Sequence, residues 1–225
     1  CNSMGSSSPA DGLERFATRK QHFEPGTTFH YSSFGWRLVT VAIEAAAGES
    51  YATFVRTRIL EPLGMRHTTI DGVSGPPADM ATYYFPRFAA NPRYGPQEPS
   101  PVDFSCFSGS GAIISTPSDM VRFGLAVNGG GLLKTDTVAR LQASERLDSG
   151  APTGYGLGWD LETVTVAGRP TDVIETDGEL RGGMVATFIT WPERGIVIAI
   201  MSNTSHADTA SLGGRVLEIF AEPGR

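Results

Sequence analysis

Residues Val185 to Ser202 read VATFITW-PERG-IVIAIMS, and this stretch decides the fold class. Two runs of apolar and β-branched residues, Val185–Trp191 and Ile196–Ser202, flank the turn-forming residues Pro192 to Gly195. The stretch therefore predicts a β-hairpin. Similar runs upstream predict three further strands, at Tyr155–Trp159, Thr163–Val166 and Val173–Thr176.

Helical periodicity dominates the chain before these strands. In Gly35–Ala47 the apolar residues leave Arg37, Thr40 and Glu44 on one stripe, which we expect to face water. Ser50 is a fitting N-cap for Tyr51–Leu60, and we expect these two helices to pack as a hairpin. Further predicted helices are Leu13–Gln21, Met120–Val127, Thr135–Ser144 and a C-terminal helix that covers one sheet face through Leu212, Val216, Ile219 and Phe220.

The order of these elements predicts an α+β fold, because helices and antiparallel strands occupy separate parts of the chain. We expect residues 1–12 to form a flexible tract, 13–150 a helical lobe with a long irregular loop at Val73–Ser105, and 151–225 the sheet with its helix. All three are parts of one domain. So small a sheet has an exposed edge, which natural proteins seldom leave uncovered. We therefore expect that some strands of the complete sheet are missing from this chain.

Composition excludes several classes of function. Eighteen Lys and Arg against 24 Asp and Glu give a net charge of −6, which argues against a nucleic-acid partner. The longest apolar run, Ile196–Met201, is far shorter than the roughly 20 residues that cross a bilayer, so we expect no transmembrane segment. The two cysteines and four histidines show no metal-ligand spacing, and we expect no metal and no cofactor.

Several motifs resemble the serine β-lactamase and penicillin-binding-protein-like hydrolases, nearest to their esterase, peptidase and mitochondrial β-lactamase-like branch. The resemblance covers nearly all of this chain and about the last two-thirds of the family domain. Its motifs are FEPGTTFHYSSFGW at Phe23–Trp36, GESY at Gly48–Tyr51, PLGM at Pro62–Met65, GSG at Gly109–Gly111, STPSDM at Ser115–Met120, GYGLGW at Gly154–Trp159 and PERG at Pro192–Gly195.

The resemblance implies an acyl-enzyme mechanism. A serine attacks the substrate carbonyl, a lysine three residues later on the same helix face takes its proton, and a tyrosine relays a proton to the leaving group. Tyr31 stands at the tyrosine position, although a plain tyrosine at a helix start is the alternative. Ser33 stands where the family carries a substrate-binding asparagine.

A third family element pairs a basic residue with a glycine on an edge strand, and it falls at Thr176-Asp177-Gly178-Glu179. The resemblance implies that these four residues bind substrate, with the N–H of Glu179 in the oxyanion hole. Thr176 replaces the basic residue, and the neighbouring acids make the expected field unfavourable for an oxyanion. Tyr31 and Gly178 should line opposite walls of one pocket.

The nucleophile motif itself is missing from these residues. The only two lysines, Lys20 and Lys134, follow Ala17 and Gly131 by three positions, so no Ser-x-x-Lys occurs. In the family this motif precedes the Pro-Gly-Thr segment, so the resemblance implies that the first strands and the nucleophile helix are absent. A complementing chain or segment would then have to supply them.

Two functions follow from these observations. One is a serine hydrolase of small-molecule esters, amides or peptides in partial form, inactive alone. The other is a non-catalytic β-lactamase-like binding protein. Cys1 with the Ser- and Gly-rich tract after it is compatible with a lipid-modified terminus, so secretion or a place in the cell envelope is suggested by Cys1 and the resemblance alone.

Overall fold

The computed structural model describes residues 17–70, 77–85, 95, 98, 107–180 and 183–221. Contacts group the chain into two compact units, which we describe separately. The first comprises Cys1–Met80, Pro101–Asp119 and Leu147–Gly150, and the second comprises Ala81–Ser100, Met120–Arg146 and Ala151–Arg225. Residues 13–16 of the predicted helix at Leu13–Gln21, and most of the predicted loop at Val73–Ser105, lie outside the described residues. The described residues 18–21 form a turn and coil, so this end of the predicted helix is wrong.

Capping residues set the helix bounds in the first unit. Ser32 accepts the N–H of Gly35 at the start of α2, and Gly48, in the left-handed conformation at φ +69°, ends it. Ser50 caps the next helix through the N–H of Thr53, as predicted. The elements are α2 (Ser33–Ala47), α3 (Tyr51–Val55), a π-helical turn (Arg56–Leu60), α4 (Glu61–Leu63) and the antiparallel pair β1 (Thr69–Ile70) and β2 (Ile113–Ile114).

The predicted hairpin of the first two helices is wrong. Ser33–Ala47 and Tyr51–Leu63 meet at a bend of 78°. The connection is only three residues long, and Glu44 of α2 accepts the N–H of Tyr51 at 2.9 Å, which ties the two helix ends together. Within the described residues no single helix is long and apolar enough to cross a membrane; this bent pair passes that test only when joined, by length and composition.

Helix α2 buries the side that we expected to face water. Arg37 and Thr40 are only 6% and 1% exposed. The Thr40 hydroxyl donates toward the carbonyls of Trp36 and Ser108, and the loop at Gly109 packs so closely on Thr40 that a side chain there would clash. The packing of this loop on α2 therefore decides which side of the helix is buried. Three apolar residues of α2 are exposed instead: Phe34 (55%), Leu38 (45%) and Val39 (43%).

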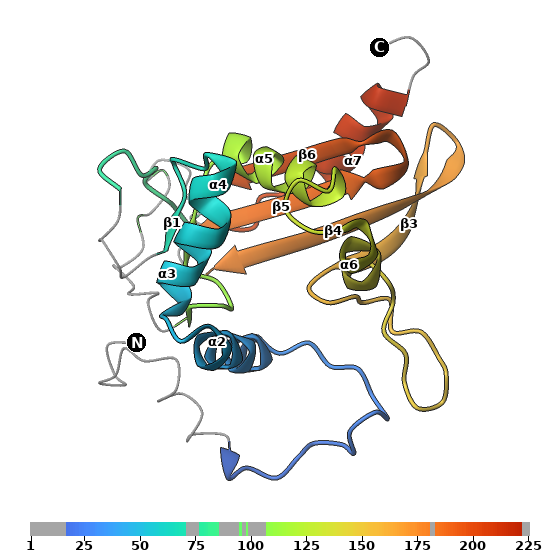
Figure 1. The fold of residues 1–225 in the computed structure, drawn as a ribbon. Helices are drawn as coiled ribbons and strands as arrows, with labels where there is room; N and C mark the ends of the chain where they lie inside the picture. Colours follow the sequence, from blue (N-terminus) through green and yellow to red (C-terminus); the bar gives the residue numbers. More distant parts are fainter. Residues whose placement is uncertain are drawn as a thin grey trace. The chain divides into compact units, whose positions relative to one another are not determined.

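The second unit is built on a four-stranded antiparallel sheet in the order β3-β4-β5-β6 (Figure 1). The predicted hairpin is confirmed, with Trp191 opposite Ile196. The predicted strand at Tyr155–Trp159 is wrong, because the N–H of Gly156 donates to the Trp159 carbonyl in a tight turn. The strands are β3 (Asp160–Val166), β4 (Arg169–Leu180), β5 (Met184–Trp191) and β6 (Ile196–Ser202).

Helix α7 (Thr209–Ala221) lies along one face of this sheet (Figure 1). Of the four residues that we predicted to face the sheet, Val216 packs against the core, and the other three do not. Gly213, Leu217 and Ala221 are buried, whereas Leu212, Ile219 and Phe220 are about half exposed. On the other face Gly124 of α5 (Pro117–Asn128) packs against Phe188 and Val197. A short helix, α6 (Thr135–Leu141), follows α5 in the chain.

Acidic residues gather on the α7 face of β3 and β4. Asp160 lies opposite Glu175 in the register, so two carboxylates face each other across the strands. Burial raises the pKa of Glu175, and the neighbouring charges of Glu162, Asp177 and Asp160 raise it further. Glu162 and Glu175 also line a hollow of about 440 Å³ between α7 and the sheet.

Two adjacent glycines of α7 should respond oppositely to alanine. A Cβ at Gly213 would lie 2.6 Å from Cδ1 of Ile189, whereas one at Gly214 meets nothing within 4 Å. We expect Gly213→Ala to cost about 1–3 kcal/mol by overpacking. Gly214→Ala should stabilise by roughly 0.5–1 kcal/mol through helix propensity. Urea unfolding of the two variants checks this, and equal effects would contradict the close packing of α7 at Gly213.

The acidic residues on this face predict that the effect of Glu175→Gln on folding stability depends on pH. Because the pKa of Glu175 is raised in the folded state, the stability it contributes is present below its ordinary pKa and lost as the pH rises through the raised value. Glu175→Gln should therefore stabilise the protein at pH 7, by roughly 0.2–1 kcal/mol, and the gain should vanish near pH 4. Thermal melting at both pH values measures this, with Glu193→Gln in an exposed turn as the control; destabilisation at pH 7 would contradict it.

Candidate functional site

A glycine turn fixes the chain that leads to Tyr31. The Thr27 hydroxyl donates to the Glu24 carbonyl at 2.6 Å, and Gly26 between them has φ +81°. The N–H of Asp148 donates to the Gly26 carbonyl at 2.9 Å, and a side chain at Gly26 would collide with the Asp148 carboxylate. The turn therefore requires glycine for both its conformation and its close contact.

Tyr31 stands directly before the N-terminus of α2. It is 54% exposed, while the hydroxyl of the next residue, Ser32, is engaged in the helix cap at 3.3 Å from the N–H of Gly35. Ser33 is the first helical residue and is exposed. Its N–H is among the first amides of α2, which no carbonyl of the helix can satisfy. A phenol, a hydroxyl and the positive end of a helix dipole thus lie together near the surface.

Sequence reasoning missed Arg37 as part of this region. It lies four residues after Ser33, which places the two on the same side of the helix. Its guanidinium carbon is 6.0 Å from the centre of the Phe34 ring, and its Nε is buried without a hydrogen-bond partner. The i, i+4 spacing from Ser33 was the available signal, but the stripe that contains Arg37 suggested a solvated surface.

The second element, Thr176 to Glu179, lies where β4 extends beyond β3. The register of β3 with β4 ends at Asp160 opposite Glu175, while β4 stays paired with β5 as far as Leu180. In the described residues β4 thus has a strand on one side only from Thr176 to Leu180. A Cβ added to Gly178 would meet nothing within 4 Å, so the sheet face on that side, opposite α7, has room for a side chain at this position.

Strand alternation separates the side chains of this element. Asp177 lies opposite Thr187, whose hydroxyl is hydrogen-bonded to Thr209 of α7 at 2.7 Å, so Asp177 and Glu179 belong to the α7 face. Glu179 accepts the N–H of His206 and lies 3.2 Å from its imidazole Nδ1. Thr176 points to the opposite face. The side chains of these acids and of Thr176 therefore lie on opposite faces of the sheet, and the effect of the acids on an oxyanion stays a prediction.

The two candidate elements belong to different units. Tyr31 and Ser33 lie in the first, and Thr176 to Glu179 lie in the second. That Tyr31 and Gly178 share one pocket therefore stays a prediction. Within the described ranges no group of three His, Cys, Asp or Glu is arranged to hold a metal ion.

Comparison with known proteins gives one consistent family. The family model described as Beta-lactamase matches residues 3–220. Penicillin-binding protein 4* of Bacillus subtilis is 30% identical over 155 residues, covering 66% of this chain and 34% of that protein. A D-aminopeptidase of Cereibacter sphaeroides is 28% identical over 206 residues, covering 90% of this chain and 38% of that protein.

The fold matches solved structures as well. The D-amino acid amidase of Ochrobactrum anthropi SV3, solved in complex with L-phenylalanine amide, superposes with a TM-score of 0.74 at 21% identity. The match covers 94% of this chain and 61% of the amidase. The chain spans about a third of the length of these two curated relatives. Because the family model matches residues 3–220, nearly the whole length, the chain belongs to the beta-lactamase family.

Proposed function

We propose that this chain forms the substrate-contacting part of a serine hydrolase that cleaves amide, peptide or ester bonds through an acyl-enzyme. The observation that carries the proposal is the exposed Tyr31 beside the capped N-terminus of α2, in a chain of the beta-lactamase family. The names of two relatives, a D-aminopeptidase and a D-amino acid amidase, support amide chemistry.

In this proposal the residues have distinct tasks. The nucleophile oxygen bonds to the carbonyl carbon as its proton passes to its base. When the tetrahedral adduct collapses, the bond from that carbon to the leaving nitrogen or oxygen breaks, the Tyr31 hydroxyl gives its proton to the leaving atom, and Tyr31 regains a proton from the base. The Ser33 hydroxyl hydrogen-bonds the substrate. The open edge at Gly178 admits the substrate backbone, and the N–H of Glu179 stabilises the oxyanion. Thr176 offers a hydroxyl but no positive charge.

The nucleophile must come from a segment outside the 225 residues, because no Ser-x-x-Lys occurs in them. We propose that a complementing segment carries it and covers the apolar side of α2. The exposed Phe34, Leu38 and Val39 support this, since an exposed apolar row on a helix marks an interaction surface. The edge strand β6, which pairs with β5 alone among the described strands, offers a second place for such a segment.

A non-catalytic binding protein is the second candidate. One observation favours it: Thr176 stands where the family carries a basic residue. In that case the region around Tyr31 and Ser33 would bind a ligand without reacting with it.

Substitution of Tyr31 separates the two candidates. The chain is extended by the residues that its gene encodes before Cys1, and hydrolysis of a neutral p-nitrophenyl ester and of amino acid amides is followed. We expect turnover, and we expect Tyr31→Phe to lower kcat by about 10²–10⁴-fold because proton transfer is lost. Tyr51→Phe, the same chemical change on the neighbouring α3, is the matched control and should leave kcat unchanged.

Three results would count against the hydrolase. One is a coding sequence that has a stop codon directly before Cys1, or that encodes no Ser-x-x-Lys upstream of it. Another is a folded extended chain without turnover of any ester or amide. The third is an equal kcat for Tyr31→Phe and the unsubstituted protein, which would remove Tyr31 from the mechanism.

A further inference from the structure

The backbone N–H of Glu179 faces the unpaired side of β4. Ala167 and Gly168, with φ +49° and +74°, form the two-residue turn that joins β3 to β4. The residue after such a turn, here Arg169, directs its N–H toward the preceding strand, and every second residue of an unbroken ladder repeats this direction. Glu179 is one of these residues, and β3 has ended before it. Its N–H therefore points to the open edge.

The carboxylate of Glu179 contacts His206, which lies in the loop between β6 and α7. One oxygen, Oε1, accepts the backbone N–H of His206 and lies 3.2 Å from its Nδ1. Both the imidazolium and the neutral ring protonated at Nδ1 can donate to this oxygen. The two side chains are 60% and 41% exposed, and pairs so exposed contribute little to global stability. The value of the contact is therefore local.

The backbone of His206 is strained. Its φ is +59°, in the left-handed region that glycine adopts freely and other residues adopt at a cost in free energy. Because the exposed pair adds little to stability and the conformation lowers it, glycine would serve the fold as well as histidine does. Strain of this kind is typical of residues that have a task in function.

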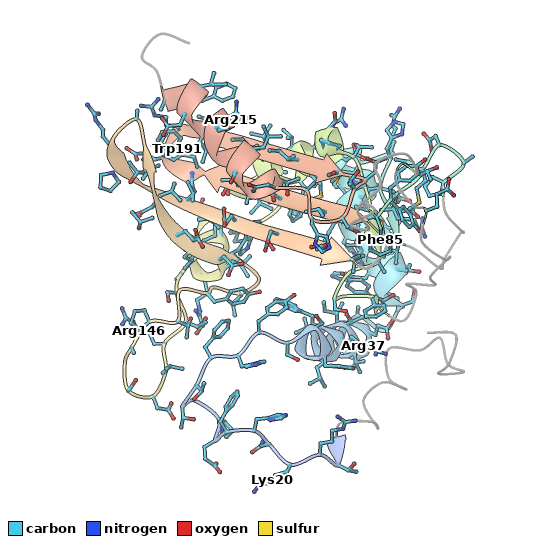
Figure 2. The ribbon with its side chains drawn as sticks, turned by 180° about the vertical axis from the view of Figure 1, so that it is seen from behind. Lys20, Arg37, Phe85, Arg146, Trp191 and Arg215 are labelled. Atoms are coloured by element: carbon cyan, nitrogen blue, oxygen red, sulfur yellow. The ribbon has the colours of Figure 1, made fainter. Side chains whose placement is uncertain are left out.

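The loop that carries this histidine is fixed by a neighbouring segment around Tyr84. The N–H of Tyr84 donates to the Asn203 carbonyl at 2.8 Å, and the N–H of Ser205 donates to the Tyr84 carbonyl at 3.0 Å. Gly183, directly before β5, lies so close to the backbone of Tyr84 that a side chain there would clash. Phe85, the next residue, lies at the same end of the sheet as the tip of β4 (Figure 2). The imidazole is thus mounted on a firmly bonded loop.

We propose that His206 is a positioning residue that holds the end of β4 through the Glu179 carboxylate, so that the Glu179 N–H is in place to bind the oxyanion of the substrate. The role of this N–H rests on the proposed function. A donor stabilises an oxyanion best when it is held in position before the reaction. No described strand restrains this part of β4 on the β3 side, so the contact with His206 supplies a restraint that the sheet does not.

Hydrogen exchange of the 225-residue chain tests the restraint without any turnover. The informative amides are those of Gly178 and Leu180, which strand alternation directs to β5. His206→Gly removes the imidazole and relieves the strained φ. We expect both amides to exchange about 3–10-fold faster, with the β5–β6 hairpin unchanged and a melting temperature within about 2 °C of the original. His206→Asn is the matched control, because asparagine tolerates this φ and its Nδ2 replaces Nδ1; it should exchange like the original.

Kinetics of the chain extended by its upstream coding sequence test the positioning role. His206→Gly should lower kcat for the p-nitrophenyl ester about tenfold and leave KM within about twofold, since the oxyanion exists only after the substrate has bound and begun to react. His206→Asn should keep kcat within about threefold of the original. A merely structural histidine would not give this division between kcat and KM together with rescue by asparagine.

Several outcomes would overturn the inference. Unchanged exchange at Gly178 and Leu180 in His206→Gly would remove the restraint, and equal acceleration in the β5–β6 hairpin would show that the histidine supports the whole sheet instead. An unchanged kcat in an extended chain that turns over ester would remove the positioning role alone. An extended chain without turnover contradicts the proposed function and the oxyanion role with it, whereas exchange still decides whether His206 restrains β4.

Discussion

The packing of Thr40 against the loop at Ser108 and Gly109 determines the surfaces of the first unit. Because that loop allows no side chain at Gly109 and receives the Thr40 hydroxyl, α2 must turn its polar stripe inward. Two consequences follow from this one orientation. The apolar residues Phe34 and Leu38 face outward, where a further segment can cover them, and Arg37 is buried beside the helix N-terminus.

In the second unit the corresponding constraint is the difference in length between two strands. β4 continues for five residues after its register with β3 has ended, so among the described residues Thr176 to Leu180 are paired on one side only, although β4 is an inner strand of the sheet. Strand alternation then sends Asp177 and Glu179 to the α7 face and leaves Thr176 on the other. A strand that added to this edge would therefore have the two carboxylates beside it on one face and the Thr176 hydroxyl on the other.

Local signals in the sequence predicted the elements well. Ser50, the Pro192–Gly195 turn and the strand Ile196–Ser202 depend on capping and turn chemistry within a few residues, and the structure has all three. Which side of a helix faces inward depends on distant residues, and there the predictions were wrong for α2. For α7 the prediction was right at Val216 and wrong at Leu212, where close packing of the helix at Gly213 decides which side is buried.

In the candidate site, too, some residues could be identified from local motifs and others depend on tertiary packing. Motif resemblance selected Tyr31, Ser33 and the Thr176–Glu179 element, and that these residues contact substrate stays a prediction. Arg37 escaped notice because hydrophobic periodicity treats any charged residue as solvated, whereas burial of its guanidinium is a tertiary effect.

Covalent labelling tests most directly the proposal that a serine outside these 225 residues is the nucleophile of the hydrolase. A fluorophosphonate probe is added to the 225-residue chain and to the chain extended through its upstream coding sequence, and labelled peptides are identified by mass spectrometry. The account predicts no labelled serine in the shorter protein and one, in a Ser-x-x-Lys sequence, in the longer one. A labelled serine within the 225 residues, such as Ser33 or Ser110, would contradict it.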